Sequence, residues 1–290
     1  MITDAEFQDL MERIDEDLRK ESVPIPARPL SATAEASKRL RMTIGGPNVL
    51  PAVPGRYDGL TTEAHIIAWY DRRYGDRLKM NCRLGSVVVM ILGDPWRLLL
   101  PIVYGSVTIT CDPDRKTHPS TKRWELPVCN VLERIEQFPP GQAAILTLEQ
   151  RRALLNFFVF SMKTLQDLDG IADKSFIAEA LADLESAVMH IMSHPAQYGL
   201  SRWASLQFME KLLKSYLATK KATVPRNHQL QQLANSAQQL GLPALDPAAI
   251  AAIQCSAGVR YGEEQATLRE AIMAHHASLR LAEIISEHIR

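Results

Sequence analysis

Arginine and histidine side chains near the end of the sequence could act on a phosphate group. Arg269 and His276 stand seven residues apart in a segment with helical periodicity, so they lie about 340° apart around a helix axis, on nearly the same face. An imidazole can move protons to and from oxygen atoms, and a guanidinium can stabilise charge on a phosphate. Arg269 and His276 are therefore the candidate catalytic residues. The alternative is a solvated arginine and a buried or interfacial histidine.

A cluster of basic side chains around one expected inter-helix loop is a second candidate site. Such a concentration of positive charge can bind phosphate groups. Lys214 also follows Glu210 by four residues, which is the favourable order for an exposed ion pair on a helix. The cluster therefore predicts either a phosphate-binding surface or an ordinary solvated face. Its members are Lys214, Lys220, Lys221, Arg226 and His228.

The cysteines and the remaining histidines do not indicate a metal centre. His190 and His194 have the spacing of two ligands on one helix, but no third ligand accompanies them. The sequence also lacks a phosphate-binding glycine loop and other cofactor motifs. We therefore expect neither a metal nor a cofactor. The four cysteines form no Cys-x-x-Cys pair, so buried thiols are expected at Cys82, Cys111, Cys129 and Cys255.

The elements that must position these residues are helices. Beyond residue 172 the apolar residues recur at helical spacing, and the connections between the apolar segments are short. Ser201, Asn227 and Asp246 are candidate helix caps, and Pro247 suits a first helical turn. Antiparallel helices with short connections predict an up-down bundle. The expected helices span about 174–193, 201–220, 228–240, 246–257 and 263–288.

Short motifs in this bundle resemble those of the HEPN family of small helical domains. The resemblance covers residues 172–288 and rests on the order and spacing of AEALADLESAVMHIM, SLQFMEKLLKSYL, NHQLQQLA and AGVRYG. It implies that Arg260 and Tyr261 occupy the turn before the last helix. An Arg-Tyr pair at this turn is common in non-catalytic relatives. In those relatives the role of the pair is architectural, and the resemblance implies the same role for Arg260 and Tyr261. The alternative is that Arg260 contacts a phosphate of a nucleotide or RNA.

Catalytic HEPN domains resemble one another in an Arg-x(4–6)-His motif at the start of the last helix, and they usually pair their motifs in a dimer. No histidine follows Arg260 at that spacing, where Gln265, Ala266 and Thr267 stand instead. Arg269 with His276 satisfies the motif, but nine residues later in the chain. The resemblance therefore leaves a metal-independent ribonuclease as an alternative to a non-catalytic domain.

The first half of the chain predicts a mixed domain and resembles no family that we can name. Helices are expected at 3–20, capped by Thr3, and at 61–74. Val-, Ile- and Leu-rich segments separated by turn residues predict a three- or four-stranded antiparallel sheet. The fold class is therefore α+β, with a mixed domain over 1–168 and a HEPN-like bundle over 172–290. The expected strands are 78–92, 96–104 and 107–111, and further helices are expected at 32–41, 128–137 and 147–168.

Composition and charge narrow the choice of function. The chain has 33 basic and 33 acidic residues, so no overall charge attracts it to nucleic acid or a membrane. Without a signal peptide or a long apolar run, a cytoplasmic protein is expected. The leading hypothesis is a non-catalytic module that binds a protein partner or forms a homodimer through its bundle. The resemblance implies a setting in RNA-linked stress, toxin–antitoxin or phage-defence systems. A dimeric ribonuclease and a nucleotide- or RNA-binding module are the alternatives.

Overall fold

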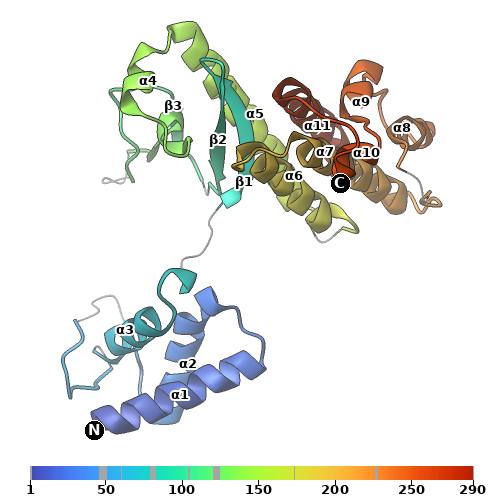
Figure 1. Cartoon of the computed structure of the whole chain (residues 1–290). Helices are drawn as coiled ribbons and strands as arrows, with labels where there is room; N and C mark the ends of the chain where they lie inside the picture. Colours follow the sequence, from blue (N-terminus) through green and yellow to red (C-terminus); the bar gives the residue numbers. More distant parts are fainter. Residues whose placement is uncertain are drawn as a thin grey trace. The chain divides into compact units, whose positions relative to one another are not determined.

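Close contacts divide the chain into an N-terminal unit, Met1–Asn81, and a C-terminal unit, Cys82–Arg290 (Figure 1). The computed structural model describes residues 2–45, 51–59, 61–78, 83–103, 105–119, 125–172, 174–225 and 228–289. Each unit has its own hydrophobic core.

Three α-helices build the N-terminal unit. They are α1 (Asp4–Lys20), α2 (Arg28–Leu40) and α3 (Thr62–Tyr74), with short 3₁₀ turns η1 (Ile25–Ala27) and η2 (Gly75–Leu78). Thr3 closes the predicted capping box with Glu6 at the start of α1. The three helices bury one apolar face each because their apolar residues recur at helical spacing. The shared core contains Phe7, Met11, Ile14, Ala32, Ala36, Ile66, Trp69 and Tyr70.

A buried carboxylate ties the three helices together. Asp15 on α1 is fully buried, and it accepts hydrogen bonds from Tyr74 (2.6 Å), Arg19 (3.0 Å) and Arg28 (3.3 Å). Burial alone would raise the pKa of Asp15, but the hydrogen bonds from Tyr74 and Arg19 and the charges of Arg28 and Arg73 hold this pKa below its ordinary value. The ionised carboxylate is therefore the form that stabilises the N-terminal unit.

An antiparallel hairpin begins the C-terminal unit. Strands β1 (Arg83–Ile91) and β2 (Asp94–Pro101) pair antiparallel, with Val88 opposite Arg97 and a register shift between Arg83 and Gly85. The connecting residues Leu92 and Gly93 both have positive φ, 53° and 95°, as a tight two-residue hairpin turn requires. The predicted α+β fold with a small antiparallel sheet is thus confirmed.

The third predicted strand does not join this hairpin, so the predicted meander is wrong. Strand β3 (Thr108–Thr110) pairs in parallel with β4 (Val128–Asn130). The helix expected over 128–137 is also wrong, because β4 and the 3₁₀ turn η3 (Val131–Arg134) occupy this segment. The buried Asn130 explains both departures. Its amide donates to the carbonyl oxygens of Asp112 and Arg115 and accepts from Leu132 N–H, so it holds the intervening loop against β4.

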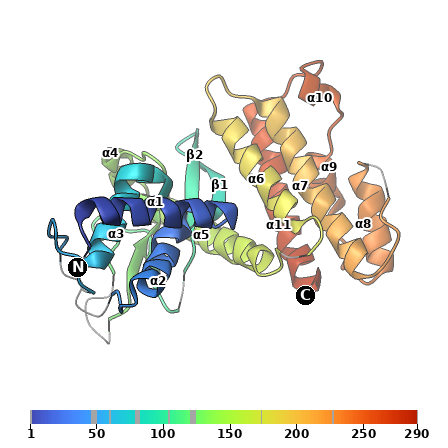
Figure 2. The same cartoon turned by 90° about the horizontal axis from the view of Figure 1, so that it is seen from below.

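Helices make up the rest of the C-terminal unit. The central helices α6, α7 and α11 lie side by side (Figure 2). Each predicted bundle segment corresponds to an observed helix, and α10 is an additional short one. Their bounds are α4 (Pro140–Ile145), α5 (Leu148–Asp169), α6 (Ile177–Met192), α7 (Tyr198–Thr219), α8 (Leu230–Gln239), α9 (Pro247–Ile253), α10 (Gly258–Tyr261) and α11 (Leu268–Ile289).

Two of the three predicted bundle caps fall within the described residues. Asp246 caps α9, because its side chain accepts from Ala248 N–H at 2.9 Å. Ser201 does not cap α7, since that helix already begins at Tyr198 and Ser201 lies buried inside its first turns. The earlier start brings Gly199 against the backbone of Val259, where a Cβ atom would lie 2.4 Å from a carbonyl oxygen. Asn227 lies outside the described residues.

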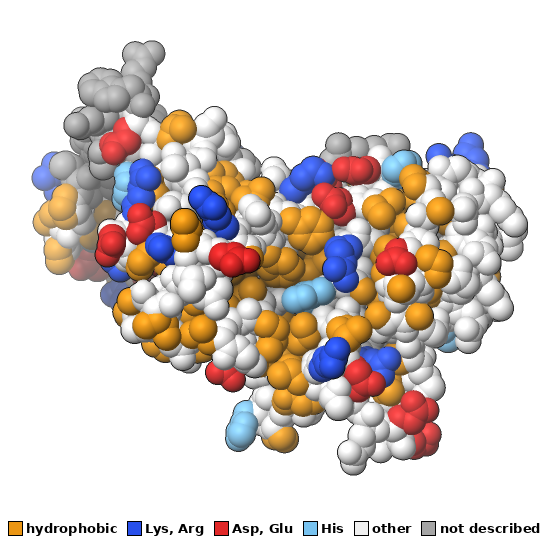
Figure 3. All heavy atoms as spheres, turned by 90° about the horizontal axis from the view of Figure 1, so that it is seen from above, with side chains coloured by type: hydrophobic (Ala, Val, Ile, Leu, Met, Phe, Trp, Pro, Cys, Tyr) orange, Lys and Arg blue, Asp and Glu red, His pale blue; other side chains and the backbone are white. Residues whose placement is uncertain are grey.

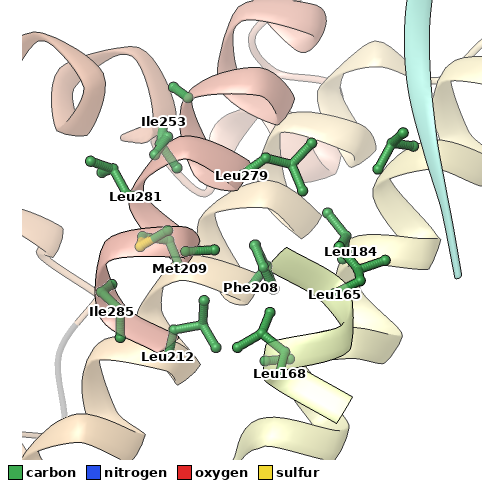
Figure 4. Close-up of a cluster of buried hydrophobic side chains, with 14 of the residues drawn as sticks. Leu165, Leu168, Leu184, Phe208, Met209, Leu212, Ile253, Leu279, Leu281 and Ile285 are labelled. Atoms are coloured by element: carbon green, nitrogen blue, oxygen red, sulfur yellow. The ribbon is translucent and has the colours of Figure 1, made fainter. Parts of the chain in front are cut away.

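One continuous core joins the hairpin to the bundle. Buried side chains of α5, α6, α7, α9 and α11 meet in it (Figure 4), and the hairpin residues Val87 and Leu98 belong to the same cluster. Helices α5 and α6 both pack on β1 and β2. The compact units therefore divide between Asn81 and Cys82, whereas the sequence-based division near 168–172 falls inside the C-terminal unit and stays a prediction about domains.

Replacing Asp15 by alanine tests the role of its carboxylate. Removing it leaves Arg28 buried without its partner, and we expect a loss of about 3–5 kcal/mol in the stability of the N-terminal unit. Hydrogen exchange followed by mass spectrometry should show lost protection within 1–81 and unchanged protection within 82–290. Asp9→Ala, an exposed carboxylate on the same helix, is the matched control. Equal protection in the two variants would contradict the anchoring role.

Candidate functional site

His275 and His276 on α11 both bind the backbone of Val88 on β1. Val88 N–H donates to Nε2 of His275 at 3.1 Å, and Nε2–H of His276 donates to the Val88 carbonyl oxygen at 2.8 Å. Val88 is buried, and these groups face away from β2. The two imidazoles therefore take the place that a neighbouring strand would fill along this edge of the hairpin.

Burial keeps both imidazoles neutral. It lowers the pKa of His275 to about 3, with a smaller contribution from His276, and burial is also the main reason for the lowered pKa of His276. Because Nε2 of His275 accepts a hydrogen bond, its proton lies on Nδ1. Because Nε2 of His276 donates, Nδ1 of His276 is the ring's acceptor.

Arg269 and His276 are not joined by contact. Arg269 is exposed in the first turn of α11, about two turns before His276. The ring of His276 lies 5.0 Å from that of Phe157 on α5 and binds Val88. No hydrogen bond, ion pair or ring contact connects Arg269 with His276 among the described residues. Within one chain the two candidate residues therefore share a helix face but make no direct contact.

A second group of polar side chains surrounds Glu210 on α7. Trp203, Gln207, Glu210 and Lys214 recur at helical spacing along one stripe of this helix. Glu210 is buried, and its carboxylate accepts from Lys214 Nζ at 2.5 Å and from Gln207 Nε2 at 3.1 Å. It also contacts Nδ1 of His228 at 2.6 Å. A buried carboxylate with several donors is well satisfied, and here it fixes the orientation of the His228 ring.

Trp203 lies between this group and α10. Its half-buried ring is 6.0 Å from the ring of His228 and 5.8 Å from the guanidinium carbon of Arg260. The same guanidinium lies 5.7 Å from the ring of Tyr261. His228 and Tyr261 are largely solvent-accessible, with 60% of the His228 side chain and 70% of Tyr261 exposed. We call Trp203, His228, Arg260 and Tyr261 the Trp203 corner.

Gln254, at the end of α9, holds the corner in place. Its side chain accepts from Leu230 N–H at 2.9 Å and donates to the His228 carbonyl oxygen at 3.3 Å. Arg202 in turn donates to the Gln254 carbonyl oxygen. Neither Gln254 nor Trp203 was a sequence-predicted site residue, because Trp203 fits the apolar stripe of its helix equally well. An exposed corner contact between segments far apart in the chain leaves no local sequence signal.

Residues 174–288 match the family model of the HEPN domain. This part of the chain is a HEPN domain. The resemblance expected over 172–288 is thus confirmed, and the match extends over α6 to α11. Comparisons with curated proteins and with solved structures found no match. The hairpin and α5 precede the matched residues, so the contacts of His275 and His276 with Val88 tie the HEPN domain to a preceding segment of the same compact unit.

The structure brings together only part of the predicted basic cluster of the HEPN domain. Lys214 is 15% exposed and paired with Glu210. Lys220 is exposed with its ammonium 5.3 Å from the Tyr216 ring, and Lys221 is exposed with a positive φ of 55°. Arg226 lies outside the described residues. Of the predicted ligand-binding residues, His228, Arg260 and Tyr261 are the ones that meet around Trp203.

The described part of the chain contains no group of three or more His, Cys, Asp or Glu side chains arranged to hold a metal ion. None of its helices combines the length and the apolar character needed to cross a bilayer. Burial raises the pKa of the Cys111 and Cys255 thiols to about 11, so both remain protonated at neutral pH.

The neutral His275 predicts a pH-dependent stability of the C-terminal unit. Its pKa is lower in the folded chain than in the unfolded chain, so its contribution is fully present above about pH 6.5 and declines as the pH falls toward about 3. We expect unfolding to become easier by about 2 kcal/mol between pH 7 and pH 5. Urea unfolding, followed by hydrogen exchange within 82–290, measures this change.

His275→Gln should flatten this pH dependence, since glutamine offers an acceptor for Val88 N–H without titrating. His194→Gln, at an exposed histidine of the same unit, should leave the pH dependence unchanged. An equally steep decline in His275→Gln and in the native chain would assign the effect to other groups.

Proposed function

We propose that the HEPN domain is a non-catalytic module that binds single-stranded RNA at the Trp203 corner. The observation that carries this proposal is the Trp203 ring, flanked by the guanidinium of Arg260 and by the imidazole of His228. Aromatic faces stack on bases of any sequence, and guanidinium groups bind phosphates with paired hydrogen bonds. A site of this kind binds RNA without requiring a defined sequence.

The charges at the corner favour an anionic ligand. Arg260 is exposed and lies against the rings of Trp203 and Tyr261, and it has no carboxylate partner among the described residues. A phosphate can therefore bind Arg260 without breaking an ion pair. Lys214 is less available because Glu210 neutralises it. Glu210 serves instead to orient His228, whose exposed edge faces the solvent beside Trp203.

The contacts of the candidate catalytic pair, Arg269 and His276, support a non-catalytic role. His276 uses one ring nitrogen to bind Val88, and its ring packs on Phe157. Arg269 stands about two helical turns away. A histidine held in this way stabilises the joint between α11 and β1, which accounts for its position without invoking catalysis. Participation in stress, toxin–antitoxin or defence systems stays a prediction that follows from the resemblance alone.

Arg260→Gln tests the binding proposal. Losing a charge-assisted contact should weaken the affinity for a short oligouridine by about 10-fold or more at low salt. Fluorescence anisotropy of a labelled oligouridine measures the affinity, and a salt titration should show a shallower salt dependence for the variant. Arg269→Gln, an exposed arginine on α11, should bind as the native chain does. Unchanged affinity in Arg260→Gln would rule out the corner as the RNA site.

The contact between Glu210 and His228 favours a second candidate function, a metal-independent ribonuclease. A buried carboxylate 2.6 Å from Nδ1 orients the imidazole, as a general base requires. The other ring nitrogen could accept the proton of a 2′-hydroxyl while that oxygen attacks phosphorus. The bond to the 5′-oxygen would break, and this oxygen would take a proton from water as the 2′,3′-cyclic phosphate forms, with Arg260 stabilising the charge on the phosphate oxygens.

Incubation of RNA with the full chain and a chelator distinguishes these functions. We expect no cleavage, because the leading proposal assigns the corner to binding. Cleavage that is lost in His228→Ala and kept in His276→Ala would establish the second candidate. Cleavage that is lost in both Arg269→Ala and His276→Ala would instead establish the pair first identified from spacing. Circular dichroism of each variant checks that the bundle remains folded.

A further inference from the structure

A groove between α5 and α11, beside the tip of the hairpin, shares no lining residue with the Trp203 corner. It consists of two hollows of about 260 Å³ and 470 Å³ that share Phe157 and His276. Ile91, Leu146 and Leu154 are among the apolar residues that line the smaller one. Figure 3 shows a hollowed face on which hydrophobic side chains surround a histidine, with basic side chains beside it.

Large apolar side chains remain accessible around the groove. Met90 and Leu92 line the smaller hollow and are 37% and 47% exposed. Ile145 and Leu148, which flank the lining residue Leu146 in sequence, are 66% and 56% exposed. Single exposed apolar residues are ordinary, but an apolar groove with accessible side chains such as Met90 and Leu92 in its lining is typical of an interaction surface. The groove therefore has the apolar character needed to bury the face of a partner.

Two arginines on α11 add positive charge to one side of the groove. Arg280 lines the larger hollow, and Arg269 lies on the same stripe of α11, eleven residues earlier or about 16 Å along the axis. Both are exposed and have no carboxylate partner among the described residues. The nearby Glu283 and Glu287 are instead held by Lys163, at 3.5 Å and 2.9 Å. The surface therefore combines an apolar floor with two unpaired guanidinium groups on one side.

We propose that this groove binds an amphipathic helix of another protein, with its apolar face in the two hollows and acidic side chains opposite Arg269 and Arg280. Two helices form the walls, and a third helix packs well into such a groove through residues that recur every three or four positions. Acidic residues about three turns apart on the partner would match the two arginines. A second copy of this chain would bring its own positive stripe to the groove and would be repelled.

Two synthetic peptides test this proposal on the full chain. Both are 16-residue helices with leucines on one face; one carries glutamates beside the leucines and the other carries lysines. We expect the acidic peptide to bind about 10-fold or more tightly than the basic peptide. In the double variant Arg269→Glu and Arg280→Glu this preference should reverse. Lys220→Glu, at an exposed lysine away from the groove, should preserve it.

A second variant tests the apolar half of the surface. Met90→Gln, at a partly exposed side chain, should weaken binding of both peptides several-fold without changing the preference for acidic residues, because it removes buried apolar area alone. Binding is measured by fluorescence anisotropy of labelled peptides. No binding, or equal affinity for the two peptides in the native chain, would overturn the proposal.

Two other occupants of the groove, a second copy of this chain and a nucleic acid, would also overturn the proposal, and each would give a distinct experimental result. If the chain sediments as a dimer that Arg280→Glu dissociates, and the acidic peptide does not bind this dimer, a second copy fills the groove. If an oligouridine displaces the acidic peptide and loses affinity in Arg280→Glu but not in Arg260→Gln, the groove binds nucleic acid. This last comparison also separates the groove from the Trp203 corner, where Arg260 is the residue that matters.

Discussion

A two-stranded hairpin leaves one backbone edge of each strand without a partner, and buried backbone groups must be paired. In the C-terminal unit, side chains from the bundle supply the missing partners of β1. His275 and His276 bind both polar groups of Val88, while Glu185 on α6 accepts from the amide and the hydroxyl of Ser86. Arg97 on β2 completes this second contact by pairing with Glu185. The small sheet and the helical bundle therefore depend on each other for stability.

The N-terminal unit relies on the same physical principle with different chemistry. Its helices are short, and a buried carboxylate at Asp15 draws donors from α1, from the start of α2 and from the end of α3. In both units, a polar group that must be satisfied in the interior sets how neighbouring elements approach. The apolar cores supply most of the driving force for folding, but such contacts select one arrangement among several that bury similar area.

Helices α7 and α11 each serve two purposes. Their inner faces build the shared core around Phe208 and Leu279. Their outer stripes carry residues of the two proposed binding surfaces. On α7 the outer stripe runs from Trp203 to Lys214 and meets His228 and Arg260 from other segments. On α11 it contains the exposed arginines and His276 beside the groove. Because a packed core holds both helices rigidly, these surfaces are positioned before any ligand arrives.

The sequence by itself determined most of the helices, because apolar residues at helical spacing and caps such as Thr3 and Asp246 are local signals. It also carried the family resemblance, since the order of short motifs requires no knowledge of contacts. Only the tertiary structure decided that Thr108 pairs with Val128, that His276 serves the hairpin edge, and that His228 and Arg260 meet at Trp203. Such partners are distant in the chain. Which residues pair depends on which buried polar groups still lack a hydrogen-bond partner once the elements have packed, and no single segment of the sequence encodes this.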